Sequence, residues 1–124
     1  MIEYMVKVQD NGDKEWYLNG KLHREDGPAI EYTNGDKLWF LNGERHREDG
    51  PAIERVNCYK SWFLNGKLHR EDGPAIERGN GDKEWYLNGK QYTETQYNQV
   101  RKNDCIENQI VEIKGKKYIL KSVE

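Results

Sequence analysis

The chain of 124 residues has the length of a single domain. Charged residues make up 34% of it and hydrophobic residues only 35%, yet the formal net charge is −2. This balance argues against a basic nucleic-acid binder, and four Trp and eight Tyr supply enough apolar area to argue against disorder. There is no run of about 20 apolar residues to span a membrane and no secretory signal pattern, so we expect a cytoplasmic protein with free thiols at Cys58 and Cys105.

The first element that the sequence predicts is a strand near the amino terminus. Apolar residues alternate with polar ones at Ile2, Tyr4, Val6 and Val8, which indicates a half-buried strand. We expect it to pair with residues 14–18 through a hairpin turn at Asn11-Gly12.

The main signal is a repeat of 23 residues. Trp occurs at positions 16, 39, 62 and 85 and nowhere else, with three full copies starting at Lys14, Lys37 and Lys60 and a partial copy starting at Lys83. A fixed period of this kind indicates a repeat architecture. Asn-Gly and Asp-Gly turn pairs interrupt each copy too often for a helix, so this region is predicted to be β.

Each copy is expected to hold two strands and one structured loop. Copies can stack equivalently in an antiparallel sheet only if each adds an even number of strands. A turn centred on Asn34-Gly35 would place Ile30 opposite Trp39. The loop would then run from Asn42 to Gly50, and Pro51 would start the next strand.

Alternation along these strands assigns the side chains to two faces. One face carries Ile30, Trp39 and Leu41, and we assign it to the core because it is the more apolar. The other face would display an aromatic row flanked by acidic residues, and this row consists of Tyr17, Phe40, Phe63 and Tyr86.

The last part of the chain departs from the repeat. Thr93 to Gln96 has the pattern of a capping box, which predicts a short helix over about 94–103. A hairpin with strands at 110–114 and 117–123 is expected to follow. A basic cluster around Lys114 leaves open whether this part is a cap or a binding element of its own.

The predicted fold is therefore mainly β. Residues 1–90 form a single-layer antiparallel sheet made of an amino-terminal strand and hairpin repeats. Residues 91–124 form an α/β cap with a short helix and a β-hairpin.

The segment from Gly35 to Asn57 and its copies resemble the 23-residue MORN repeat and its variants. They share a Gly-Asp-Lys hairpin turn, an aromatic strand and an Asn-Gly-Lys-x-His segment, over about residues 11–90. The Asn-Gly-Lys segment lies two residues early here, and HREDGPA replaces the usual Gly-rich loop. The form WYLNGKLHREDGPAIE also resembles repeats in small proteins of bacteriophages and large DNA viruses. The resemblance implies a repeat sheet used for binding and transfers no catalytic residue.

The sequence His-Arg-Glu-Asp occurs three times, at 23–26, 46–49 and 69–72, and we call these segments the HRED loops. They either brace their own turns or present a ladder of side chains to a partner, formed by His23, Arg24, His46, Arg47, His69 and Arg70. The aromatic row has the same two interpretations, a stiffening ladder or a partner-binding stripe.

Neither set of residues predicts an enzyme. A nucleophile and its base must lie about 3 Å apart, and the sequence places neither Ser nor Cys beside a His. Copies about 10 Å apart cannot share a metal ion whose ligands lie about 2 Å from it. We therefore predict no catalytic residues, no metal and no cofactor.

The function that the sequence favours is non-enzymatic protein binding. Its most concrete version is a phage-encoded inhibitor of a bacterial defence complex, such as an anti-CRISPR protein. The alternatives are a membrane-associated or scaffolding module, as MORN repeats imply, and a sponge for a small ligand or nucleotide. We expect a protein partner rather than a nucleic acid, and open sheet edges would permit a homodimer. The target and the binding face stay open.

Overall fold

The computed structural model describes residues 2–106 and 110–119. The chain divides into two compact units between residues 91 and 92. The protein is mainly β, with one large antiparallel sheet, several two-stranded hairpins and a helix. The predicted fold class is confirmed. No helix in this part of the chain has the length and apolarity needed to cross a membrane.

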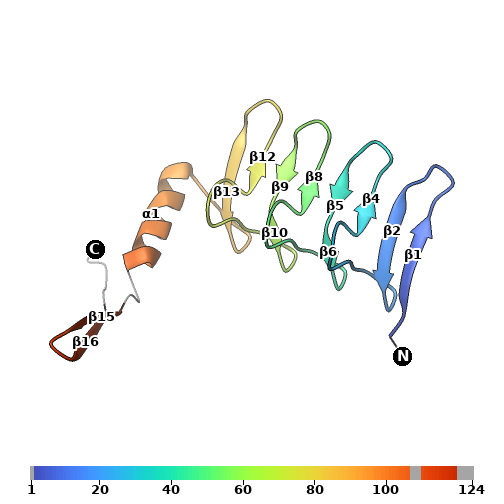
Figure 1. Cartoon of the computed structure of the whole chain (residues 1–124). Helices are drawn as coiled ribbons and strands as arrows, with labels where there is room; N and C mark the ends of the chain where they lie inside the picture. The colour runs from blue at the N-terminus through green and yellow to red at the C-terminus, as the bar shows by residue number, and fades with distance from the viewer. Residues whose placement is uncertain (1, 107–109, 120–124) are drawn as a thin grey trace. The chain divides into compact units, whose positions relative to one another are not determined.

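Successive hairpins lie side by side in the large sheet (Figure 1). Its order is β1-β2-β4-β5-β8-β9-β12-β13-β14, with β3 paired to β2. The strands are β1 (Tyr4–Val8), β2 (Lys14–Leu18), β3 (Lys21–Leu22), β4 (Ile30–Glu31), β5 (Lys37–Leu38), β8 (Ile53–Glu54), β9 (Lys60–Ser61), β12 (Ile76–Glu77), β13 (Lys83–Leu87) and β14 (Lys90–Tyr92).

The edge strand β1 pairs with β2 as predicted, from Tyr4 opposite Leu18 to Val8 opposite Lys14. The expectation of a half-buried strand is wrong, because every residue of β1 is exposed. As an edge strand, β1 has only β2 beside it among the described strands, and the first HRED loop extends toward the second copy.

Along the main order of the large sheet each copy contributes two strands, as the parity argument required, and the first copy adds β3 beside β2. The predicted register is wrong by one residue, because Ile30 lies opposite Leu38 and not Trp39. The Tyr32 amide donates to the Asp36 carbonyl, so the turn encloses three residues with only Gly35 at positive φ. A three-residue turn of this type shifts the pairing relative to the two-residue turn we expected.

A shift of one residue exchanges the two faces of a strand. For the strand that carries Trp39, the core face is therefore the opposite of the one we assigned, whereas Ile30 lies in the core as we expected. It is a narrow cluster formed by Ile30, Leu38 and Ile53. Phe40 and Phe63, which we expected on the exposed face, pack against this cluster. Trp39 lies on the other face and is half-buried.

A second hairpin replaces the first half of the predicted loop at 42–50. Phe40 pairs with Arg45 and Leu41 with Glu44, around Asn42-Gly43 at φ of 50° and 82°. Both turn residues thus have the positive φ that a two-residue hairpin turn needs. These strands are β6 (Phe40–Leu41) and β7 (Glu44–Arg45), and the next copy repeats them as β10 (Phe63–Leu64) and β11 (Lys67–Leu68).

The carboxyl-terminal unit contains α1 (Glu94–Ile106) and a hairpin of β15 (Ile110–Ile113) and β16 (Lys116–Ile119). The capping box is confirmed, because the Gln96 amide donates to Thr93 Oγ1 at 3.1 Å and the Thr93 amide donates to Gln96 Oε1 at 3.0 Å. The helix is longer than the predicted 94–103. The predicted strand residues 120–123 and the thiol of Cys105 lie outside what the structure describes.

Candidate functional site: the HRED loops and the grooves between them

The arginine of each HRED loop is held against the sheet. Arg24 Nε donates to Asp26 at 2.9 Å, and Nη1 donates to the Pro28 carbonyl and to Glu31, both at 3.1 Å. Its guanidinium carbon lies 4.0 Å from the ring centroid of Trp16. A planar guanidinium can stack on a ring and use its in-plane donors at the same time. Arg24 therefore joins its loop to its own strands.

The following copies repeat this arrangement. Arg47 lies 3.9 Å above Trp39, and Arg70 lies 3.8 Å above Trp62. Both arginines make the hydrogen bonds that Arg24 makes, to the equivalent Asp, Pro carbonyl and Glu. The Trp side chains are thus half-buried by arginine rather than by an apolar layer.

The histidines join each copy to the next one. The Asn42 amide donates to His23 Nδ1 at 2.9 Å, and His46 and His69 accept the same bond from Asn65 and Asn88. Because Nδ1 accepts, the neutral ring carries its proton on Nε2, which lies 3.3 Å from Glu25 in the first loop. The histidine side chains are therefore largely buried in the junctions between copies.

Carboxylates form the outer surface of the loops. Their side chains are 76–86% exposed, whereas the arginine side chains are 20–22% exposed. The hydrogen bond and charge of each arginine lower the pKa of Asp26 and Asp49 below the usual 3.8, which keeps them ionised. We call this row the acidic ladder, which consists of Glu25, Asp26, Glu48, Asp49, Glu71 and Asp72.

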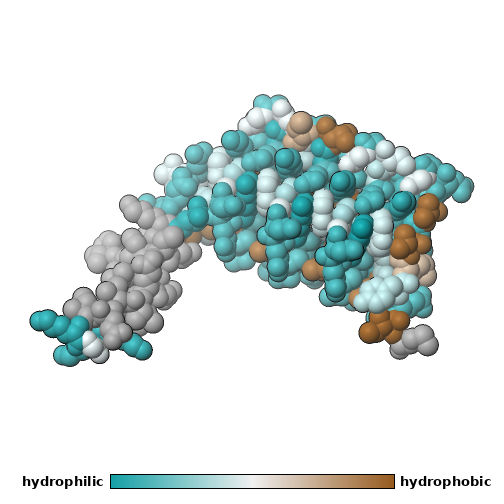
Figure 2. Space-filling model, in the orientation of Figure 1, coloured by the Kyte–Doolittle hydropathy of each residue, from teal (hydrophilic) through white to brown (hydrophobic). Residues whose placement is uncertain are grey.

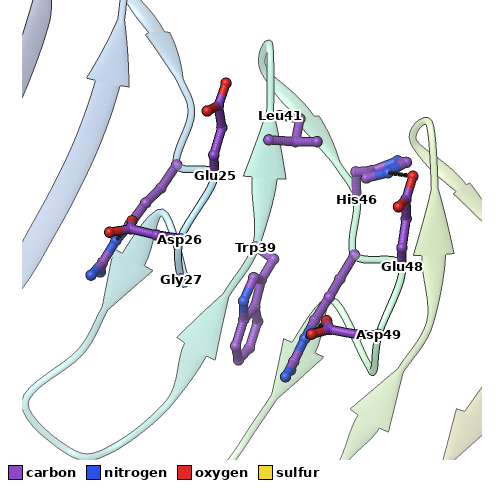
Figure 3. A pocket seen from close by; sticks show the side chains of 10 residues that line it. Glu25, Asp26, Gly27, Trp39, Leu41, His46, Glu48 and Asp49 are labelled. Carbon is purple, nitrogen blue, oxygen red and sulfur yellow. Dashed lines mark hydrogen bonds and ion pairs between the residues drawn. The ribbon is translucent and has the colours of Figure 1, made fainter.

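Grooves lie between successive HRED loops. Figure 3 shows one of about 590 Å³, with Trp39 at its base, Glu25 and Asp26 on one side, and Glu48 and Asp49 on the other. One copy further along, a groove of about 580 Å³ has Trp62 at the equivalent place. A third, of about 410 Å³, lies where β1 and Trp16 meet the first HRED loop. The repeat thus produces a series of grooves, each lined by an indole, by loop carboxylates and by the recessed loop arginines.

The aromatic row is half-buried rather than displayed. The Tyr17 hydroxyl donates to Glu15 at 2.8 Å, which raises the pKa of Tyr17. Burial and the nearby Glu84 raise the pKa of Tyr86. Phe40 and Phe63 pack on the core cluster, and these contacts support the interpretation of the row as a ladder that stiffens the sheet. Partner binding by this row stays a prediction.

Sequence reasoning missed a second link between copies, at the tops of the hairpins. Asp36 accepts a 2.9 Å bond from the Val56 amide, which lowers its pKa, and Asp13 accepts one of 2.8 Å from the Thr33 amide. The residue that could have indicated this link is the Asp of each Gly-Asp-Lys turn, which we took to be part of its own turn and not a contact with the next copy. At the end of the second copy Tyr59 takes this position and packs against the core cluster instead.

The potential nucleophiles lie apart from the histidines. Cys58 is exposed at a hairpin turn, with φ of 70° at the position where other copies have Gly. Ser61 is fully buried in β9, between Ile53 and Ile76 of the neighbouring strands. Among the residues that the structure describes, no three His, Cys, Asp or Glu side chains are grouped to hold a metal ion.

Comparisons with protein-family models, with curated proteins and with solved structures gave no match to the chain. The resemblance to MORN repeats therefore rests on the residues quoted above, and the geometry of the loops carries the functional argument.

Proposed function

We propose that the chain is a non-enzymatic protein-binding module whose acidic ladder contacts a basic surface of its partner. The observation behind this proposal is that the loop arginines are recessed against Trp while the loop carboxylates point outward. A surface of this kind repels phosphate groups and attracts Lys and Arg.

The grooves fit the same kind of partner. A Lys or Arg side chain entering the groove at Trp39 would meet carboxylates from two loops, Glu25 and Asp26 on one and Glu48 and Asp49 on the other, and the carboxylates outnumber the recessed arginines of these loops, Arg24 and Arg47. Leu41 and the part of the indole that Arg47 leaves uncovered give its aliphatic stem an apolar surface to lie on. Because the groove recurs in successive copies, an extended basic segment could contact more than one at a time.

A non-enzymatic role accords with the state of the histidines. A general base needs a free ring nitrogen within reach of the proton it removes. In His23, His46 and His69, Nδ1 accepts a backbone bond and Nε2 faces a glutamate. Ser61, the serine nearest to them in sequence, is buried.

The narrower version of the proposal is a phage-encoded inhibitor of a bacterial defence complex, such as an anti-CRISPR protein acting in the host cytoplasm. It rests on the sequence resemblance to phage repeats and on the acidic ladder, because channels that hold nucleic acid in such complexes are positively charged. Expressing the protein in a strain with an active CRISPR system should abolish protection against a targeted phage. Undiminished protection would contradict this version.

The binding proposal is tested with a Lys-rich peptide as the probe. The variant Glu25→Gln/Glu48→Gln/Glu71→Gln keeps the shape of the ladder and removes three charges. Its matched control, Asp10→Asn/Glu44→Gln/Glu94→Gln, removes three charges from exposed residues elsewhere. Calorimetry should show peptide binding that the ladder variant loses and the control keeps. Equal loss in both variants, or no binding by the wild type, would overturn the proposal.

The two alternative functions, a membrane-associated module and a small-ligand sponge, are tested by giving the same protein other probes. Flotation with anionic vesicles would favour the membrane-associated module, and a thermal shift with a nucleotide would favour the sponge. A wild-type protein that binds either probe and ignores the peptide contradicts the acidic-ladder proposal.

A further inference from the structure

The first strand of the large sheet is open and apolar. Among the described strands, β1 is paired with β2 alone. Ile2 is 68% exposed, Tyr4 69%, Val6 49% and Val8 62%. Figure 2 shows hydrophobic residues gathered along the edge where Figure 1 places β1, beside a largely hydrophilic face. Long, exposed apolar edges are available for pairing with another strand.

The backbone of β1 has a defined outward side. The Glu3 carbonyl accepts a bond from the Asn19 amide, and the Gln9 amide donates to the Asp13 carbonyl, so the odd-numbered residues point their polar groups toward β2. Because these groups alternate along a strand, Tyr4, Val6 and Val8 direct theirs away from the sheet. An added strand must therefore bond to the even-numbered residues.

We propose that β1 pairs antiparallel with β1 of a second copy of the chain, around a twofold axis at Met5. Ile2 then lies opposite Val8 of the partner subunit, and Tyr4 opposite Val6 of the partner subunit. Glu3 lies opposite Lys7 of the partner subunit. Every apolar residue from 2 to 8 meets an apolar residue, and the two charged residues meet opposite charges.

This register also satisfies the backbone. It places even-numbered residues opposite even-numbered ones, so the outward amides and carbonyls form hydrogen-bonded pairs. Glu3 and Lys7 then occupy non-hydrogen-bonded pairs, where side chains approach most closely. An axis at Val6 would also satisfy the backbone, but it would place Met5 opposite Lys7 and Ile2 opposite Asp10. Charge complementarity therefore selects the axis at Met5.

The opposite edge of the large sheet differs in just these respects. It is formed by β14, which has three residues, Lys90, Gln91 and Tyr92. It offers neither the length nor the self-complementary pattern of β1. The pairing therefore closes as a dimer of two chains and does not propagate.

Pairing at β1 would continue the large sheet across the twofold axis. Opposite residues of an antiparallel pair point to the same face, so both acidic ladders would lie on one side of the joined sheet. This inference stands on β1 alone and does not depend on the function proposed for the ladder.

The charge pair provides the test. Wild-type protein should sediment at twice the 14.7 kDa of one chain. Glu3→Lys alone and Lys7→Glu alone each place like charges opposite one another twice and should give monomers. An equimolar mixture of these two variants should recover a dimer, because each offers the charge that the other needs. The double variant Glu3→Lys/Lys7→Glu should dimerise by itself.

Two further variants separate pairing from folding. Val6→Pro removes an amide that points outward, so it should abolish the dimer while the β1–β2 hydrogen bonds persist. Asp10→Lys changes an exposed charge outside the paired segment and should leave the dimer intact. A monomeric wild type at millimolar concentration, or a dimer that survives Val6→Pro and both single charge reversals, would overturn the proposal.

Discussion

On one face of the large sheet, Ile30, Leu38 and Ile53 pack as a narrow apolar row. On the other face, Arg47 lies over Trp39 and bonds to the carboxylates of Asp49 and Glu54. The first face is stabilised by removing aliphatic groups from water. The second is stabilised by stacking and by hydrogen bonds between charged groups. A chain with 34% charged residues can fold in this way because much of its charge is built into one face.

The largest effect is expected from breaking the apolar face. Ile53→Ala removes a side chain that is 6% exposed, and it should lower the free energy of unfolding by about 3 kcal/mol. Denaturation in urea measures this change. Val56→Ala, at a residue that is 63% exposed, serves as the control and should change it by less than about 0.5 kcal/mol. Equal costs for the two variants would show that the core lies elsewhere.

Breaking the charged face should cost less. Arg47→Lys keeps the charge but loses the planar stack on Trp39 and the bond from Nε to Asp49. We expect a loss of about 1.5 kcal/mol in the same urea assay. Lys60→Arg, on an exposed residue, is the control. An unchanged free energy of unfolding in Arg47→Lys would mean that the stacking of Arg47 on Trp39 does not stabilise the fold.

The apolar face contains one polar defect, which a single substitution can remove. Ser61 lies where the preceding copy has Leu38, and its hydroxyl has no hydrogen-bond partner within the described structure. Ser61→Ala should raise the free energy of unfolding by about 1 kcal/mol. Ser61→Thr keeps the hydroxyl and should give no gain. A loss of stability in Ser61→Ala would mean that the hydroxyl is satisfied in solution.

Acid should lower the free energy of unfolding by weakening the hydrogen bonds of the charged face. We expect this effect to be smaller than those of the substitutions above, because the carboxylates are exposed. The pKa values of Asp26 and Asp49 are lowered in the folded state. Their stabilisation is therefore present above the usual Asp pKa of 3.8 and is lost as the pH falls through the lower folded-state values. Asp49→Asn should flatten the dependence of the urea midpoint on pH below about 4. An unchanged slope would contradict these bonds.

Much of this arrangement follows from the sequence. The spacing of the Trp residues predicted the repeat, and parity predicted two strands per copy in the large sheet. The capping box at Thr93 predicted where α1 begins. These features depend on local residue types and on their period, which a single sequence contains in full.

The register of the strands and the second hairpin of each copy could not be predicted from the sequence, and the reason is physical. Asn-Gly can form a two-residue turn, as at Asn42-Gly43, or the end of a three-residue turn, as at Asn34-Gly35. The dipeptide alone does not distinguish them, and one residue of difference exchanges the faces. The stacking of Arg47 on Trp39 was hidden for the same reason, since it requires knowing which face the Trp occupies.

The most direct test of the account is to locate the contact on one face. In a titration of the labelled protein with the Lys-rich peptide, amide signals of the acidic ladder and the indole signals of Trp39 and Trp62 should shift together. The amide signals of Phe40 and Phe63 should stay in place. Shifts confined to Phe40 and Phe63, or none at saturating peptide, would contradict a module that binds through its charged face.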